Sequence, residues 1–163
     1  FRYAALDGTR QIINSFQDYE GEPLYSFFIS EKTNRTAFVD HASGRRKLSN
    51  ISVEEGKWQN VQLHVNGSTA IYYINSRMAL NISGVDFSTG QFVLGTETTN
   101  AHFSDIYAIN SDRQKKIYEV TQDPCQLQKV GDATLGQGRI KLVAGKSATI
   151  NQPFRIRQLF DFA

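Results

Sequence analysis

Cysteine is nearly absent from this chain, whose 163 residues include only Cys125. A single cysteine cannot close a disulfide within the chain, so Cys125 is either a free thiol or the partner of a cysteine outside this sequence. A chain of this length can bury a sizeable core without a disulfide. The composition therefore excludes a small domain framed by disulfides and leaves an intermolecular link open.

Long apolar runs and common catalytic motifs are missing as well. No run of about 18 apolar residues occurs, and no G-x-S-x-G elbow or phosphate-binding glycine loop is present. The adjacent Glu54 and Glu55 would point to opposite faces of a strand, so they do not form a carboxylate pair. The histidines lack zinc-ligand spacing; they are His41, His64 and His102. We therefore expect no enzyme activity, no cofactor and no insertion into a membrane.

Charge and acidic residues give weak signals. The net charge of +2 is too small to indicate a polyanion partner by itself, and we expect no nucleic acid partner. Ca²⁺ needs six or more oxygen ligands. Asp86, Asp105 and Asp112 would qualify by chemistry alone, and we expect no bound metal.

The patterns that are present are those of β-strands. Val61, Leu63 and Val65 alternate with polar residues, which is typical of a strand buried on one face. Asn66-Gly67 then offers residues that tolerate the positive φ of a tight turn, and residues 70–74 resume a strand rich in β-branched and aromatic side chains. This segment predicts a β-hairpin.

Strand patterning recurs along the chain, with turn signals every 8–14 residues or so. Ser111 and Gln114 form a capping-box pattern that predicts one short helix, stopped by Pro124. We expect strands over residues 1–6, 11–18, 24–30, 35–40, 46–51, 61–65, 70–75, 77–82, 91–94 and 103–109, and in the tail over 139–143 and 154–160.

These elements predict an all-β fold, a single antiparallel β-sandwich of about 12–14 strands with one short helix. The alternating apolar positions supply its core. The residues expected there are Ile13, Phe16, Phe27, Phe38, Trp58, Val61, Leu63, Val65, Phe92, Leu94 and Ile106.

Four N-x-S/T sequons indicate a secreted, extracellular glycoprotein. Their acceptor residues are Asn34, Asn50, Asn66 and Asn81. Most of them fall at expected turns, where an acceptor is accessible. The alternative is that Asn, Ser and Thr collect in β-turns for conformational reasons.

The residues around the hairpin resemble a known family. The stretch from Gly56, "G-x-W-x-x-V-x-L-x-V", and residues 70–75, "A-I-Y-Y-I-N", resemble the central hairpin of laminin-G-like jelly rolls. Within that group they are most similar to the thrombospondin N-terminal (TSPN) domain, whose later strands resemble residues 92–95 and 103–107. The resemblance implies a concanavalin-like jelly roll that serves in the extracellular matrix as a recognition or cell-adhesion module.

The order of segments departs from that family. Residues 1–125 follow the family from its early core strands to its terminal cysteine, whereas residues 138–156 resemble its opening. A circular permutation, the start of a second repeat and a renumbering of segments all remain open. In each case the tail strands can complete the same sandwich. We therefore expect one domain over 1–163, with 1–125 as its main body and 139–163 completing it.

One departure concerns the disulfide. The family usually places a cysteine directly after the strand that here ends at Asn75, paired with the terminal cysteine. This chain has Ser76 at that position. The resemblance therefore gives Cys125 no partner within the chain.

The resemblance also implies a heparin- or heparan-sulfate-binding site on the opening strands. Lys141 and Arg155 match the basic positions, and Arg139, Lys146 and Arg157 lie beside them. Because side chains alternate along a strand, Arg139 shares a face with Lys141, and Arg155 with Arg157. If the two strands are neighbours, four cations share a surface suited to sulfate groups. The alternative is a solvated outer face.

A second basic group, Arg45-Arg46-Lys47, follows a turn and serves either binding or solubility. Two functions are therefore expected as alternatives. The first is a domain that binds glycosaminoglycans. The second is a protein-binding or assembly head of a collagen, thrombospondin or multidomain receptor, in which Cys125 suits an intermolecular link and the parent protein is an oligomer.

Overall fold

Regular structure is exclusively β-strand in the part of the chain that the computed structural model describes. That part comprises residues 2–5, 11–30, 35–51, 53–54, 56–87, 91–97, 101–104, 107–110, 115–119, 127–130, 133–136, 139–142 and 147–150. Two seven-stranded sheets and one two-stranded sheet account for its strands, and every strand pair is antiparallel.

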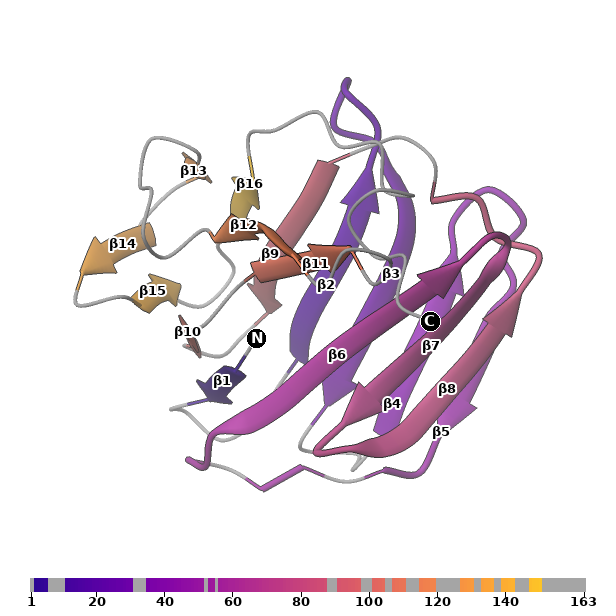
Figure 1. Ribbon diagram of the computed structural model, residues 1–163, viewed down its shortest axis with the longest axis horizontal. Coiled ribbons are helices and arrows are strands. Elements are labelled where there is room, and N and C mark those ends of the chain that lie inside the picture. The colour runs from indigo at the N-terminus through magenta and orange to yellow at the C-terminus, as the bar shows by residue number, and fades with distance from the viewer. Residues whose placement is uncertain are drawn as a thin grey trace.

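The first sheet brings segments from both ends of the sequence together (Figure 1). Its order is β14 (Ala133–Gly136), β15 (Arg139–Leu142), β10 (Ala101–Ser104), β1 (Arg2–Ala5), β6 (Gln59–Asn66), β7 (Thr69–Ile74) and β8 (Arg77–Ser83). The strand expected over 139–143 is thus present and pairs with β10.

Part of the second sheet lies behind β6, β7 and β8 in the view of Figure 1. Its order is β13 (Leu127–Val130), β16 (Ser147–Ile150), β9 (Gln91–Glu97), β2 (Gln11–Gln17), β3 (Pro23–Ser30), β4 (Arg35–Asp40) and β5 (Arg46–Ser49). The two-stranded sheet pairs β11 (Tyr107–Asn110) with β12 (Lys115–Glu119).

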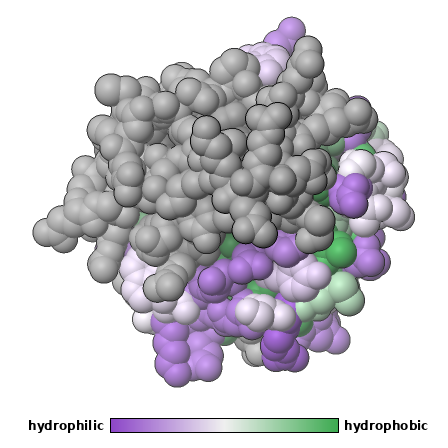
Figure 2. All heavy atoms as spheres, in the orientation of Figure 1, coloured by the Kyte–Doolittle hydropathy of each residue, from purple (hydrophilic) through white to green (hydrophobic). Residues whose placement is uncertain are grey.

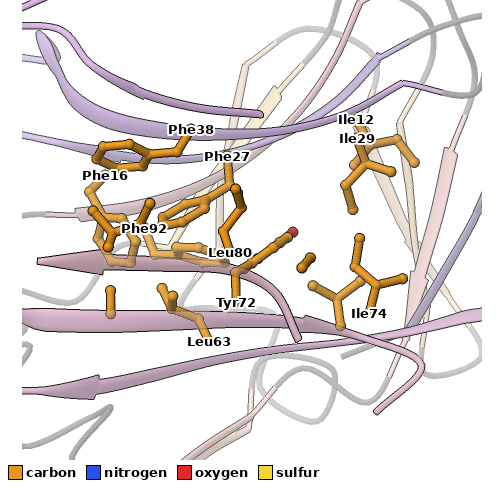
Figure 3. Packing of buried hydrophobic residues seen from close by; sticks show 14 of the residues in the cluster. Ile12, Phe16, Phe27, Ile29, Phe38, Leu63, Tyr72, Ile74, Leu80 and Phe92 are labelled. Carbon is orange, nitrogen blue, oxygen red and sulfur yellow. The ribbon is translucent and has the colours of Figure 1, made fainter. Parts of the chain in front are cut away.

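The core lies between the two large sheets, as expected for a β-sandwich (Figure 3). Phe27 of β3 stacks on Tyr72 of β7 with ring centroids 4.7 Å apart, and Phe16 packs edge-on against Phe87 at 4.8 Å. A buried Asn14 donates from Nδ2 to Tyr72 Oη at 2.6 Å. Burial raises the pKa of Tyr72 and keeps its phenol neutral. These contacts join segments that are far apart in sequence.

Most residues expected in the core are buried, and two are not. Ile13 is half-buried because β2 alternates, so that Ile12 and Phe16 face the core and Ile13 faces outward. Trp58 precedes β6 and is 38% exposed, while the next residue, Gln59, is buried. Ile106 lies outside the described residues. The confirmed residues are Phe16, Phe27, Phe38, Val61, Leu63, Val65, Phe92 and Leu94.

The hairpin of β6 and β7 forms as predicted, but its turn is shifted by one residue. Asn66 pairs with Thr69, so the two turn residues are Gly67 and Ser68. Only Gly67 has a positive φ, 56°, which fits the first central position of a type II′ turn. The prediction of Asn66 as a left-handed turn residue is therefore wrong, because Asn66 ends β6.

The prediction of a helix after Ser111 is wrong for the residues that the structure describes in that segment. Residues 115–119 form β12, which pairs with β11 from Tyr107 to Asn110. Ile117 and Tyr118 are β-branched and aromatic, types that favour strands, and sheet pairing overrides a weak helical preference. Strands β13, β14 and β16 were not predicted, and β14 falls in a glycine-rich stretch without periodicity.

Candidate functional site

The basic strand of the tail, β15, lies inside the first sheet between β14 and β10. Its register sets Arg139 against Ser104 of β10. Strand β1 pairs with the other side of β10, and its register sets Arg2 against the same Ser104 and against Asn60 of β6. Arg139 and Arg2 therefore stand in one row of the sheet, two strands apart, at roughly 10 Å given the usual strand spacing.

Burial of the neighbouring residues identifies the face to which this row belongs. Asn60 is exposed, whereas the next row includes Gln59 and Phe103, which are buried. Rows alternate between the two faces of a sheet, so the row of Asn60 belongs to the outer face. Lys141 stands two residues from Arg139, opposite the half-buried His102, and falls on the same face.

Sequence reasoning missed Arg2, since no local pattern distinguishes it from other basic residues at a strand start. It meets Arg139 only through β10, which pairs with both strands. The row of Arg139 continues to Gly136 on β14, and the row of Lys141 and His102 continues to Thr134. Neither row contains an acidic residue. The fold thus places the backbone positions of Arg2, Arg139 and Lys141 together, with no carboxylate between them.

The turn cluster, defined as Arg45, Arg46 and Lys47, has a different environment. Arg45 Nη1 donates to the carbonyl oxygen of Ser83 at 2.8 Å, and Lys47 Nζ donates to that of Asn81 at 2.6 Å. The Arg45 guanidinium also lies 5.7 Å from the centre of the Phe38 ring. Arg46 is exposed. Two of the three cations therefore bind the backbone of the opposite sheet.

These contacts close one side of the sandwich. Strands β5 and β8 are the last strands of their sheets. Asn81 and Ser83 are two residues apart on β8, so their carbonyl groups point toward the same edge. Arg45 and Lys47 occupy these acceptors, which would otherwise be free to pair with another strand. The turn cluster thus acts first as a clamp between the sheets.

The turn that presents the clamp is itself held by a carboxylate. Asp40 accepts hydrogen bonds from the backbone N–H groups of Ala42 and Ser43, and from the Ser43 hydroxyl at 2.6 Å. The hydroxyl hydrogen bond is the main cause that lowers the pKa of Asp40 below its ordinary value. Asp40 is therefore occupied in turn formation and fixes the direction from which Arg45 leaves the turn.

Metal-ligand geometry is not found where the structure can be examined. No group of three His, Cys, Asp or Glu side chains close enough to share a metal ion occurs among the described residues. The exposed Asp86 uses its backbone N–H to donate to Tyr25 Oη at 3.1 Å. The two other Ca²⁺ candidates, Asp105 and Asp112, lie outside the described residues.

Three of the four sequon asparagines are described, and all three are exposed. Asn50 follows β5, Asn66 ends β6 and Asn81 lies within β8. The position of Asn81 inside a strand differs from the turn positions expected for most acceptors. The candidates outside the described residues are Asn34, Cys125, Lys146, Arg155 and Arg157, and what was predicted for them stays a prediction.

Comparison of the chain with family models, with curated proteins and with solved structures gives no match. The resemblance to the TSPN domain therefore stays a prediction from sequence motifs. In the described residues, no helix has the length and apolar character needed to cross a membrane.

Proposed function

We propose that this chain is an extracellular, non-catalytic recognition domain that binds heparin-type sulfated polysaccharides. The observation that carries the proposal is the shared row of Arg139 and Arg2 on the outer face of the first sheet, with Lys141 beside it. Lys146, Arg155 and Arg157 lie outside the described residues, and their place in the basic set stays a prediction from the sequence. The extracellular location rests on the sequons.

The chemistry suits a sulfated chain for two reasons. Arginine presents planar, bidentate donors that match a sulfate group, and lysine adds a compact point charge. The cations stand on separate strands at roughly 10 Å across the sheet, so a linear polyanion can contact several of them at once. Because neither row contains a carboxylate, no fixed negative charge in these rows competes with the ligand.

Heparin affinity chromatography with increasing salt tests the proposal, because salt ions screen the attraction between an electrostatic site and its ligand. The wild type should elute well above about 0.15 M salt, and an Arg139→Ala/Lys141→Ala double variant should elute clearly earlier. Arg46→Ala is the matched control, because Arg46 is an exposed cation on the other sheet. Elution of the wild type below about 0.15 M, unchanged in the double variant, would contradict the proposal.

A second candidate is an assembly or protein-binding head. It is favoured by an apolar row on the outer face of the second sheet, where Ile13, Phe28, Ala37 and Leu48 stand in register across four strands. Leu48 is 60% exposed at the end of this row. The other three residues are half-buried, and a partly exposed apolar row of this kind is a common protein contact.

Sedimentation of the wild type and of a Leu48→Lys variant tests this candidate. Self-association or partner capture that the substitution abolishes would support it. A wild type that stays monomeric, together with a non-reducing gel that shows only monomer and a Cys125 thiol that alkylates in the native state, would contradict both the apolar and the disulfide-linked form.

A further inference from the structure

The outer face of β6, β7 and β8 is a second distinct surface of the first sheet. Strand register arranges its residues in three rows across the three strands. The middle row is His64, Ile71 and Asn81, and the row toward the β7–β8 turn is Gln62, Tyr73 and Met78. The third row is Asn66, Thr69 and Ser83.

This face combines apolar surface with uncharged hydrogen-bonding groups. None of the residues in its three rows is acidic, lysine or arginine. The His64 and Tyr73 rings lie 4.8 Å apart, and His64 Nε2 is 3.3 Å from Gln62 Oε1. Met78 is 57% exposed, although it is a large apolar side chain. Figure 2 shows hydrophobic residues among hydrophilic ones on the side of the molecule that carries these strands.

Asn81, a sequon residue, stands within this face and not at a loop tip. It is directly opposite Ile71, with Cβ atoms about 5 Å apart in such a pair, and Tyr73 is its diagonal neighbour at about 7–8 Å. Any group attached to Asn81 therefore starts beside Ile71 and Tyr73, and Met78 stands opposite Tyr73 in the next row.

We propose that an N-linked glycan on Asn81 folds back onto this face and covers Ile71, Tyr73 and Met78. The proposal rests on the extracellular location in the proposed function and does not depend on polysaccharide binding. The covalent bond to Asn81 determines that the glycan is what covers this face, because it keeps the first sugar rings in the neighbourhood of these side chains.

The chemistry of the face matches a neutral sugar. The C–H faces of a sugar ring can pack on an aromatic ring and on aliphatic side chains, while its hydroxyls can bond to amide and imidazole groups such as Gln62 and His64. Burial also lowers the pKa of His64, which favours an uncharged ring at neutral pH. Tethering supplies a high effective concentration, so weak contacts suffice to hold the glycan down.

Asn66 provides an internal comparison on the same sheet. Its row contains only Thr69 and Ser83, which are small and polar, and it lies beside the hairpin turn. Ile71 is its one apolar diagonal neighbour, while Tyr73 and Met78 stand two rows away. A glycan on Asn66 therefore has a smaller apolar bed, and we expect it to extend into solvent.

Oxidation of Met78 by hydrogen peroxide is a direct readout, because Met78 is the only methionine in the chain. The full chain is secreted from mammalian cells, and occupancy at each sequon and formation of the sulfoxide are followed by mass spectrometry. Oxidation follows exposure, so Asn81→Gln and Ser83→Ala, which both remove this glycan, should speed sulfoxide formation about threefold or more. Asn66→Gln should leave the rate unchanged.

Thermal unfolding supplies a second readout with an unglycosylated reference. In secreted protein, loss of the Asn81 glycan should lower the Tm by about 2–4 °C. In the same variants made without glycosylation in bacteria, the shift should vanish, which separates the glycan from the side chain. Trimming the glycan to its first sugar should preserve most of the Met78 protection, because that ring makes the nearest contacts.

The outcomes separate this inference from the proposed function. Full occupancy of Asn81 with unchanged Met78 oxidation would overturn the folded-back glycan and leave the face open to a partner. Loss of protection on trimming would overturn docking in favour of general shielding. An unoccupied Asn81 would also overturn this inference, while heparin binding through β15 and β1 would be untouched by any of these results.

Discussion

The two groups of basic residues differ in what the fold does with them. The turn cluster, Arg45 to Lys47, is the densest run of positive charge in the sequence, yet two of its members bind carbonyl groups of β8. Arg2 is far in sequence from Arg139 and Lys141, yet register brings the three to neighbouring positions on one sheet face. The difference shows that a dense run of charge in the sequence can be taken up by contacts within the fold, while register can gather charges from distant segments.

The largest expected effect comes from removing the clamp. Arg45→Ala/Lys47→Ala should lower the free energy of unfolding by about 1–2 kcal/mol, because exposed charged hydrogen bonds and one cation–π contact are lost. The β8 edge would also be freed, so self-association should increase. Urea unfolding and sedimentation measure both effects.

Heparin elution of this clamp variant sharpens the comparison. Its elution salt should stay close to that of the wild type, with Arg46→Ala as the control that removes a cation but no interstrand hydrogen bond. A loss of heparin affinity as large as that of Arg139→Ala/Lys141→Ala would show that the two groups do not differ.

The next effect concerns Arg2, which sequence reasoning did not single out. Arg2→Ala should weaken heparin binding by roughly two- to fivefold, the range expected for one solvent-exposed ion contact. Its free energy of unfolding should change by less than about 0.5 kcal/mol, as for other surface substitutions. Titration calorimetry with heparin fragments measures the affinity. An unchanged affinity would remove β1 from the site.

A smaller effect should separate stability from binding altogether. Ser76 has a φ of 64°, in the left-handed region that disfavours residues with a Cβ. Ser76→Gly should raise the free energy of unfolding by about 0.5–1 kcal/mol, with no change in heparin elution. Destabilisation by this variant would show that the serine side chain compensates for its own strain.

The smallest effect is a pH dependence of stability that arises from His64, on the outer face of β6, β7 and β8. Burial holds the pKa of His64 below its ordinary value of 6.5. The unfolded chain therefore takes up this proton first as pH falls, so stability is full above about pH 6.5 and declines below it, until the folded state also binds the proton. His64→Gln should lose this decline. If the Tm values of the wild type and of His64→Gln instead fall in parallel as the pH is lowered, without converging, this prediction is contradicted.

Much of the fold was predictable, because alternation is a local signal. The hairpin of β6 and β7 was predicted from three alternating apolar residues and a glycine turn. Alternation also explains why Ile13 and Phe16 could not both be core residues. They are three residues apart on one strand, so their side chains point to opposite faces of the sheet. Trp58 was expected in the core because aromatic residues of a sandwich mostly pack there, whereas it precedes β6 and Gln59 takes the buried position.

The candidate site was only partly predictable, because it depends on contacts between distant segments. Lys141 and Arg139 could be proposed from the motif and the period of one strand. Arg2 could not, since its partner row is set by β10, about a hundred residues further along the chain. Likewise, the carbonyl groups that bind Arg45 and Lys47 belong to a strand of the other sheet, and no sequence pattern marks an acceptor on the backbone.

One structural detail bears on the order of folding. Asn75, at the turn between β7 and β8, makes two hydrogen bonds to the backbone of Asn60 at the start of β6. Its backbone N–H donates to Asn60 O at 2.8 Å, and its side-chain Oδ1 accepts from Asn60 N–H at 2.9 Å. Its Nδ2 also donates to Gln59 Oε1 at 2.6 Å. These bonds close β6, β7 and β8 into a meander of consecutive strands.

Contacts between consecutive strands cost little loop entropy, whereas β1 and β10 must close a loop of about a hundred residues. We therefore expect the meander to become protected from hydrogen exchange before β1 during refolding, and earlier protection of β1 would contradict this order. The basic row then forms in the slowest step of sheet assembly. The outer face of β6, β7 and β8, with Asn66 and Asn81 on it, would then be complete before the row of Arg2 and Arg139.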